Sequence, residues 1–199
     1  MQLLVLLAII AIVVVSMNIH NEKMVKALQK IAERTGGEFK KKKITNRFEK
    51  IYLKIFSDSS NYHVEFSHNG RPCEIRIHDN YAGSKGSVSS IEVSCYIKRA
   101  FGMLSIEKGR IVKSDDVKTD ISDLEHLIKS PDFEKPYKEL IGKYRFNQYQ
   151  ANGPRGDFIV EGERVFVYRT RLFLDSRVEW LLGMVDDLCQ LTSLFEAYL

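Results

Sequence analysis

The sequence predicts an α+β protein with an N-terminal transmembrane helix, antiparallel β-hairpins flanked by helices, and a long C-terminal amphipathic helix. Three observations predict this class. The chain opens on the apolar run MQLLVLLAIIAIVVVSMNIH, has an alternating segment YHVEFSHNGRPCEIRIH in the middle, and closes on apolar residues at helical spacing. At 199 residues, the part after the opening run suits one compact domain or two small lobes that share a core.

The opening run has the composition of a membrane anchor. Every residue from Leu3 to Met17 except Ser16 is apolar, and the run spans roughly 25 Å as a helix, which is at the short end of what crosses a bilayer core. The alternatives are a cleaved signal peptide and a buried core segment. A signal peptide is disfavoured because no Lys or Arg precedes Lys23 and VVVSMNIH offers no small-x-small cleavage site. We therefore predict an anchor over residues 1–20 and an α+β domain over residues 21–199, either undivided or with lobes 21–112 and 113–199.

Positive charge is concentrated directly after this run. The net charge of the chain is +4, yet the segment from Glu22 to Lys54 contains eleven Lys or Arg against four Asp or Glu. The positive-inside rule then places the N-terminus outside and the domain in the cytoplasm. Nucleic-acid binding is disfavoured because the chain beyond Lys54 is net negative. The side chains predicted to contact anionic lipid, or else only to set topology, are Lys23, Lys26, Lys30, Lys40, Lys41, Lys42 and Lys43.

The segment NEKMVKALQKIAERTGG predicts a helix that follows the anchor, either continuously or after a hinge between Asn18 and Asn21. Its apolar residues Met24, Leu28 and Ile31 recur at helical spacing, and the pair at 36–37 ends it in the left-handed manner of glycine. Strands are expected next, the first in KIYLKIF.

The clearest local feature is a hairpin around Asn69-Gly70, the preferred pair for a two-residue type I′ turn. This turn pairs Phe66 with Cys73 and Val64 with Ile75, so that one face is apolar and the other polar. A slip of one residue would destroy this match, and the register is therefore well specified. The segment SSIEVSCYIKRAFGMLSIEKG then predicts two more strands, with a bend or bulge at Gly102.

Helices and a second hairpin are expected in the last third. SDLEHLI predicts a helix capped by Ser122, and short helical turns begin at Pro131 and Pro136. DFIVEGERVFVYRTRLF predicts a hairpin that turns at Gly162-Glu163. DSRVEWLLGMVDDLCQLTSLFEAYL predicts a helix with more apolar residues than one face can hold, which favours packing within the domain but also allows self-association, a protein partner or the bilayer surface.

No catalytic signature is present, and we predict no catalytic residue and no cofactor. His63 and His78 fall on the polar face of the first hairpin with Glu65, which makes these three a candidate metal site, but a plain polar surface is the favoured explanation because solvent-facing histidines are common in strands. The three cysteines are too few and too scattered for a disulfide framework and contain no C-x-x-C pair. We expect Cys73, Cys95 and Cys189 to be small buried residues, reduced and without zinc.

The apolar run followed by LQKIAERTGGEF, with Ala32, Gly36 and Phe39 in an A-x-x-x-G-x-x-F phrase, resembles a loose group of uncharacterised bacterial single-span proteins with a small α+β domain. The resemblance implies the architecture and no catalytic residue. The leading hypothesis is a membrane-anchored cytoplasmic module for binding or scaffolding, with the lipid bilayer as one partner. The alternative is an enzyme with an unrecognised active site that acts on a membrane-associated substrate.

Overall fold

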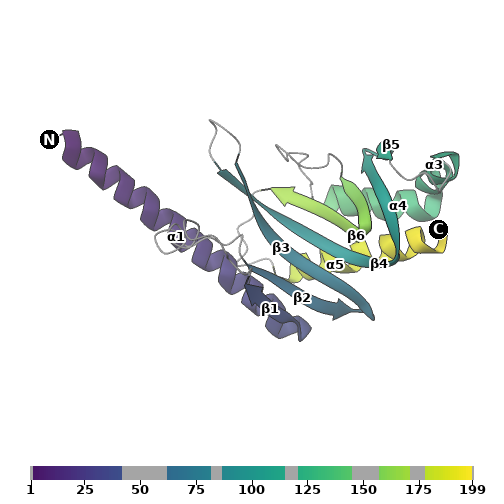
Figure 1. Ribbon diagram of the computed structural model, residues 1–199, viewed down its shortest axis with the longest axis horizontal. Coiled ribbons are helices and arrows are strands. Elements are labelled where there is room, and N and C mark those ends of the chain that lie inside the picture. Colours follow the sequence, from purple (N-terminus) through teal and green to yellow (C-terminus); the bar gives the residue numbers. More distant parts are fainter. Residues whose placement is uncertain are drawn as a thin grey trace.

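The computed structural model describes residues 2–41, 62–81, 87–114, 121–144, 157–170 and 178–198. The strands in these ranges form one six-stranded antiparallel sheet, and helices pack against it (Figure 1). The predicted α+β class with an antiparallel sheet is therefore confirmed. The expected strand over 50–56 lies outside the described residues.

Helix α1, Gln2–Thr35, has no break between Asn18 and Asn21, so the helix follows the apolar run continuously and without a hinge. Only its C-terminal half packs on the domain, where Met24, Leu28 and Ile31 are buried against strand β2, Tyr62–His68. The helix ends as predicted, because Gly36 has a φ of 66° and the Gly37 N–H donates to the Ala32 carbonyl over 3.0 Å.

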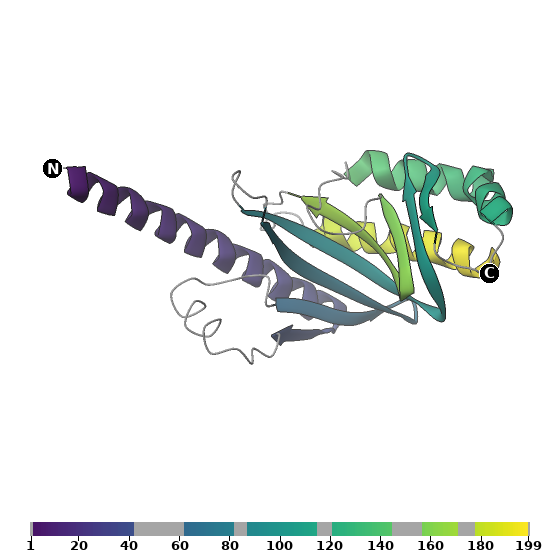
Figure 2. The same ribbon diagram turned by 45° about the horizontal axis from the view of Figure 1, so that its top comes forward.

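The N-terminal half of α1 projects away from the sheet and from the other described helices (Figures 1 and 2). Its large apolar side chains are exposed, from Leu3 at 69% to Ile19 at 51%. In the part of the chain that the structure describes, no helix is long and apolar enough to cross a membrane, so the predicted transmembrane helix is not supported by the structure.

The first hairpin forms with the predicted register. Strands β2, Tyr62–His68, and β3, Arg71–Tyr81, pair so that Phe66 faces Cys73 and Val64 faces Ile75, and Asn69 and Gly70 turn with φ values of 51° and 75°. A short strand that the sequence did not predict, β1, Glu38–Lys41, pairs with the outer edge of β2. The sequence pattern did not predict this strand because Lys, which is depleted in strands, makes up half of it.

The two strands expected after the first hairpin form one long strand instead. The prediction of a second hairpin that turns at Gly162-Glu163 is wrong. Strand β4, Ser87–Glu107, runs for 21 residues and β6, Phe158–Thr170, is a single strand antiparallel to it. Gly162, with a φ of 60°, lies opposite Phe101, where the register shifts because β4 has more residues than β6, so it belongs to a continuous strand and not to a turn. Both faces of β6 are apolar. The local sequence therefore fits a hairpin as well as it fits a single strand whose partner is distant along the chain.

Strand β5, Arg110–Ser114, pairs with the end of β4 after a turn at Lys108 and Gly109. Asp157 and Tyr137 hold this turn: the Lys108 N–H donates to Asp157 Oδ2 over 2.9 Å and the Gly109 N–H donates to the Tyr137 hydroxyl over 3.2 Å. The sequence predicted no strand here.

The helices of the last third are longer than predicted. Helix α3, Ile121–Lys129, begins one residue before the expected cap at Ser122, and α4, Pro131–Tyr144, is one helix with Pro136 inside it. Helix α5, Val178–Tyr198, confirms the predicted terminal helix. It packs on β4 with one side and on α4 with another, which accounts for its wide apolar surface.

One apolar core joins these elements. Val64, Ile75, Val93 and Val167 lie on the same face of the sheet, are buried, and belong to one cluster with the C-terminal half of α1 and with α5. The described core therefore draws residues from Met24 to Phe195.

Candidate functional site

Helix α1 carries a basic surface directly after its apolar half. Lys23, Lys26 and Lys30 are exposed and lie on one side of the helix, since residues three and four apart are neighbours there. Together with Gln29 and Glu33 they line a shallow groove of about 470 Å³. The opposite side of the same turns is buried in the domain.

The lysines of the later run lie elsewhere. Lys40 is in β1, and its ammonium group pairs with Glu65 and, over 3.0 Å, with Glu38; these hydrogen bonds, that with Glu65 first, raise the pKa of Lys40. Lys41 lies 5.4 Å from the centroid of the Tyr62 ring. Lys42 and Lys43 lie outside the described residues.

On the polar face of the first hairpin, His63 Nε2 lies 3.1 Å from Glu65 Oε1, and Glu65 is directly opposite Glu74. Ligand atoms of these three residues lie within 4.8 Å of one another. Two cations already neutralise the carboxylates: Arg76 donates two hydrogen bonds to Glu74, and Lys40, by its hydrogen bond, lowers the pKa of Glu65.

His78, the other predicted member of this site, pairs through its backbone with Ser90, and its side chain lies outside the described part of the structure. Glu74 lies on the same polar face and was not a predicted member of the site. The structure brings it to His63 and Glu65 because direct cross-strand neighbours approach more closely than diagonal ones.

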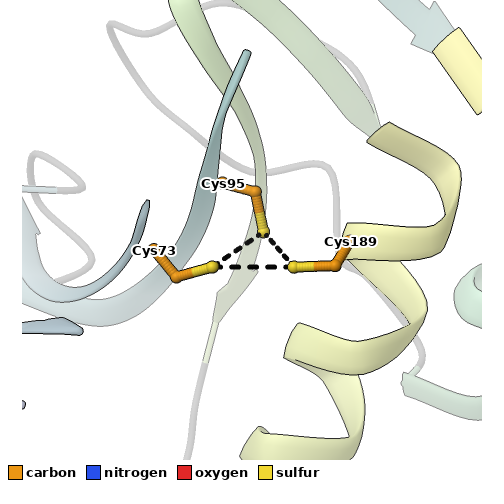
Figure 3. A group of neighbouring side chains, drawn as sticks. All are labelled: Cys73, Cys95 and Cys189. Carbon is orange, nitrogen blue, oxygen red and sulfur yellow. Dashed lines mark hydrogen bonds between the residues drawn. The ribbon is translucent and has the colours of Figure 1, made fainter. Parts of the chain in front are cut away.

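The three cysteines converge in the core, which the sequence did not predict. Cys73 in β3 and Cys95 in β4 are direct cross-strand partners, and Cys189 reaches them from α5. The three Sγ–Sγ distances are 3.4 Å for Cys73–Cys95, 3.6 Å for Cys73–Cys189 and 3.1 Å for Cys95–Cys189. Figure 3 shows the three sulfur atoms directed at a common centre. We call this group the thiol cluster.

The thiols of the cluster are free and buried, as predicted for each cysteine separately. Because Cys73 and Cys95 direct their thiols at Cys189, the pKa of Cys189 is lowered, and the nearby charges of His68 and Arg71 lower it further. The same contacts with Cys189 raise the pKa values of Cys73 and Cys95. A negative charge in the cluster is therefore best placed on Cys189.

A groove of about 650 Å³ lies on the surface beside the cluster. Cys189 lines it, together with residues of the β2–β3 turn, of β4 and of α5. Arg71 crosses the groove: its guanidinium group donates to the Tyr96 carbonyl over 2.7 Å, to Glu196 over 2.7 Å and to Ser193 over 3.1 Å. The positive charge of this group contributes to the lowered pKa of Cys189, so the cation lies near the thiols.

The thiol cluster could not be predicted from the spacing of the cysteines along the chain. Cys73 and Cys95 are 22 residues apart, and Cys189 follows Cys95 by 94 residues, far from any short metal-binding motif. The available signal was that Cys73 belongs to the apolar face of the hairpin and Cys189 to the core stripe of the last helix. No local pattern in the sequence predicts that the apolar face of the hairpin packs against the apolar face of α5.

Comparisons with protein-family models, with curated proteins and with solved structures find no match to this chain. No family is therefore assigned.

Proposed function

We propose that this protein is a membrane-anchored binding or scaffolding module, held by the apolar half of α1 with its α+β domain on the cytoplasmic side. The observation that carries the proposal is the exposure of the large apolar side chains of this half-helix, among them Leu3 at 69%, Leu4 at 72% and Ile12 at 68%. Contiguous exposed apolar surface of this kind marks contact with a membrane or another protein.

Lipid explains the exposure better than a protein groove does. Leu3, Leu4, Val5, Leu6 and Leu7 are consecutive and all exposed, so their side chains surround the helix. A groove on a partner covers one side of a helix, whereas acyl chains cover every side. The transfer of such side chains from water to an apolar phase is favourable by about 1.5 to 3 kcal/mol each.

The basic surface of α1 fits the same arrangement. Lys23 follows Ile19 by about 6 Å along the helix axis, which places it at the headgroups if the apolar half lies in the acyl chains. A lysine near an anionic leaflet gains about 1 kcal/mol, and the gain falls off within a Debye length of about 10 Å. Lys23 and Lys26 therefore lie closest to the lipid, and Lys30 is farther along the helix.

The predicted lipid contact of Lys40 and Lys41 receives less support. These residues follow the end of α1 at Thr35, about 24 Å along the helix from Ile19, and they interact with Glu65 and Tyr62. We propose that they stabilise the edge of the sheet, and that the charge that orients the protein is that of Lys23, Lys26 and Lys30.

The alternative, an enzyme that acts on a membrane-associated substrate, would use the groove beside Cys189, where polar groups converge. Those groups pair with one another, His68 with Asp186 over 2.5 Å and Arg71 with Glu196 over 2.7 Å. This pairing is typical of a stabilising network, and we rank the binding module first.

The first experiment is membrane extraction of the full chain combined with reporters fused after Leu199. We expect the protein to stay in the membrane fraction at alkaline pH and a reporter that needs the cytoplasm to be active. Release at alkaline pH, or activity of a reporter that needs an oxidising exterior, would contradict the proposal.

The basic surface is tested by replacing Lys23, Lys26 and Lys30 together with Gln. We expect a mixed orientation of the reporter, because the positive charge that retains this end of the helix is removed. The matched control replaces the exposed Lys135 and Lys138 of α4 with Gln and should leave the orientation unchanged. Equal behaviour of the two variants would show that these α1 lysines do not orient the chain.

A further inference from the structure

We propose that Cys73, Cys95 and Cys189 bind one thiophilic metal ion, Zn²⁺ being the best fit, with a fourth coordination position open to the groove beside Cys189. This departs from the expectation, drawn from their spacing, that the cysteines serve only as small core residues. It is independent of the proposed membrane anchor, since none of the three residues lies in α1.

The distances suit an ion that lies outside the plane of the sulfurs. With Sγ–Sγ distances of 3.1, 3.4 and 3.6 Å, an ion at the Zn–S distance of about 2.3 Å from each sulfur would stand about 1.2 Å above their plane. Tetrahedral geometry needs sulfurs about 3.8 Å apart, so the three sides would lengthen by about 0.2 to 0.7 Å, the Cys95–Cys189 side most. Three thiolates on one side of the ion leave a fourth position free.

The donor set is selective because only sulfur converges here. Thiolates favour Zn²⁺ and Cu⁺ over Mg²⁺, Ca²⁺ and Mn²⁺, which prefer oxygen. A buried cysteine alone is most simply a small apolar residue. Three cysteines from two strands and a helix, each with its sulfur within 3.6 Å of both others, provide the set of ligands that such an ion requires.

A cation beside the cluster favours the same conclusion. Three thiolates and Zn²⁺ carry a net charge of −1, which a nearby positive charge stabilises. The Arg71 guanidinium group donates to the carbonyl of Tyr96, the residue after Cys95, and shares its charge with Glu196, which holds it in place. The Arg71 side chain is itself only 14% exposed.

The groove gives an ion a route to the cluster. Cys73 and Cys95 are 2% and 0% exposed, whereas Cys189 is 5% exposed and lines the groove. Zinc sites with three protein ligands and one open position take water or an exogenous ligand as the fourth. A bound ion would also join α5 to β3 and β4 through its bonds, and binding should therefore stabilise the fold.

The polar cluster of His63, Glu65 and Glu74 is the weaker candidate. Lys40 and Arg76 already neutralise its carboxylates, so a cation would have to displace them. This cluster therefore serves as the matched control for the thiol cluster.

The test uses the full chain in detergent micelles, kept reduced by a non-thiol reductant, and titrates it with Co²⁺ and then Zn²⁺. We expect a near-ultraviolet charge-transfer band from thiolate to Co²⁺ that saturates at one ion per chain and disappears when Zn²⁺ displaces Co²⁺. The unfolding temperature should rise with Zn²⁺. A reduced, folded protein that shows neither the band nor the rise would overturn the proposal.

Single variants Cys73→Ala, Cys95→Ala and Cys189→Ala should lose most of the band, and circular dichroism checks that each remains folded. His63→Ala should keep the full band. Retention of the band in Cys189→Ala, or its loss in His63→Ala, would place the metal elsewhere. If a mild oxidant joins two of the three thiols in a protein that binds no Zn²⁺, the cluster is a redox pair with a third thiol and the metal proposal is wrong.

Discussion

Gly37 lies between the end of α1 and the start of β1. Its backbone is so close to β2 that no side chain fits between them. A Cβ atom at this position would lie 2.6 Å from the Glu65 carbonyl oxygen and 2.7 Å from Phe66 Cβ. Both neighbours belong to the sheet, one of them backbone, and neither can swing aside. The close approach is what brings the C-terminal half of α1 onto the core.

We predict that Gly37→Ala lowers the free energy of unfolding by about 1 to 3 kcal/mol, because the new methyl group must push β2 away. Gly142→Ala is the matched control: Gly142 lies in α4 with nothing within 4 Å of a Cβ, and the substitution should stabilise by about 0.5 to 1 kcal/mol. Chemical denaturation of both variants measures the difference. Equal stability of the two variants would disprove the close approach.

At the scale of elements, α5 is fixed to the sheet by a bridge as well as by apolar packing. Glu196 accepts from the Arg71 guanidinium group over 2.7 Å and from the Lys98 N–H over 2.8 Å, so one carboxylate joins the helix to β3 and β4. The hydrogen bond with Arg71 is the largest cause that lowers the pKa of Glu196 below its ordinary value of 4.5. A carboxyl group with a lowered pKa in the folded state stabilises the protein above its unfolded pKa, and this stabilisation is lost as the pH falls through the folded value.

We predict that Glu196→Gln destabilises the protein by about 1 to 3 kcal/mol at neutral pH, since Arg71 loses a charged partner. The difference from the wild type should begin to shrink as the pH falls below 4.5, where the carboxyl group of the unfolded chain takes up its proton. It should vanish below the lowered pKa of the folded state, where the folded carboxylate is protonated too. Denaturation curves at several pH values measure this. The control Glu134→Gln, in an exposed pair with Lys138, should change stability by a few tenths of a kcal/mol at most. A difference for Glu196→Gln that does not depend on pH would show that the bridge is not ionic.

At the scale of the whole molecule, α1 divides into a half that belongs to the domain and a half that does not. The exposed residues before Asn21 are outside the core, whereas Met24, Leu28 and Ile31 are 2%, 0% and 0% exposed. The burial of each of these three side chains contributes about 1.5 to 3 kcal/mol. The two halves of one continuous helix therefore have different effects on stability.

We predict that the fragment 21–199 unfolds within a few degrees of the full chain in mild detergent, because residues 1–20 contribute little to the core. A fragment that lacks residues 1–35 should be strongly destabilised or unfolded, since it leaves an apolar face of β2 uncovered. Circular dichroism during heating compares them. If the fragment 21–199 does not fold, the apolar half of α1 must pack on the domain, and the proposed anchor loses its main support.

The sequence predicted the features that depend on neighbours along the chain. The register around Asn69-Gly70 could be read because turn chemistry and strand alternation act over a few residues. The end of α1 at Gly36 and the start of α4 at Pro131 were local in the same way. The pairing of β6 with β4 was missed because the partner of an all-apolar strand is chosen by the whole sheet.

The sequence by itself determined the α+β class, the first hairpin, and the position of apolar and basic residues along α1. Only the tertiary structure decided that Gly162 lies within one strand opposite an irregular part of β4, that Lys40 belongs to a sheet edge, and that three cysteines meet. The physical reason is that periodicity states which face of an element is apolar and not which other face will cover it. Cys73 and Cys189 each lay on a face that had to be buried, and the packing of α5 on β4 made those two faces the same site.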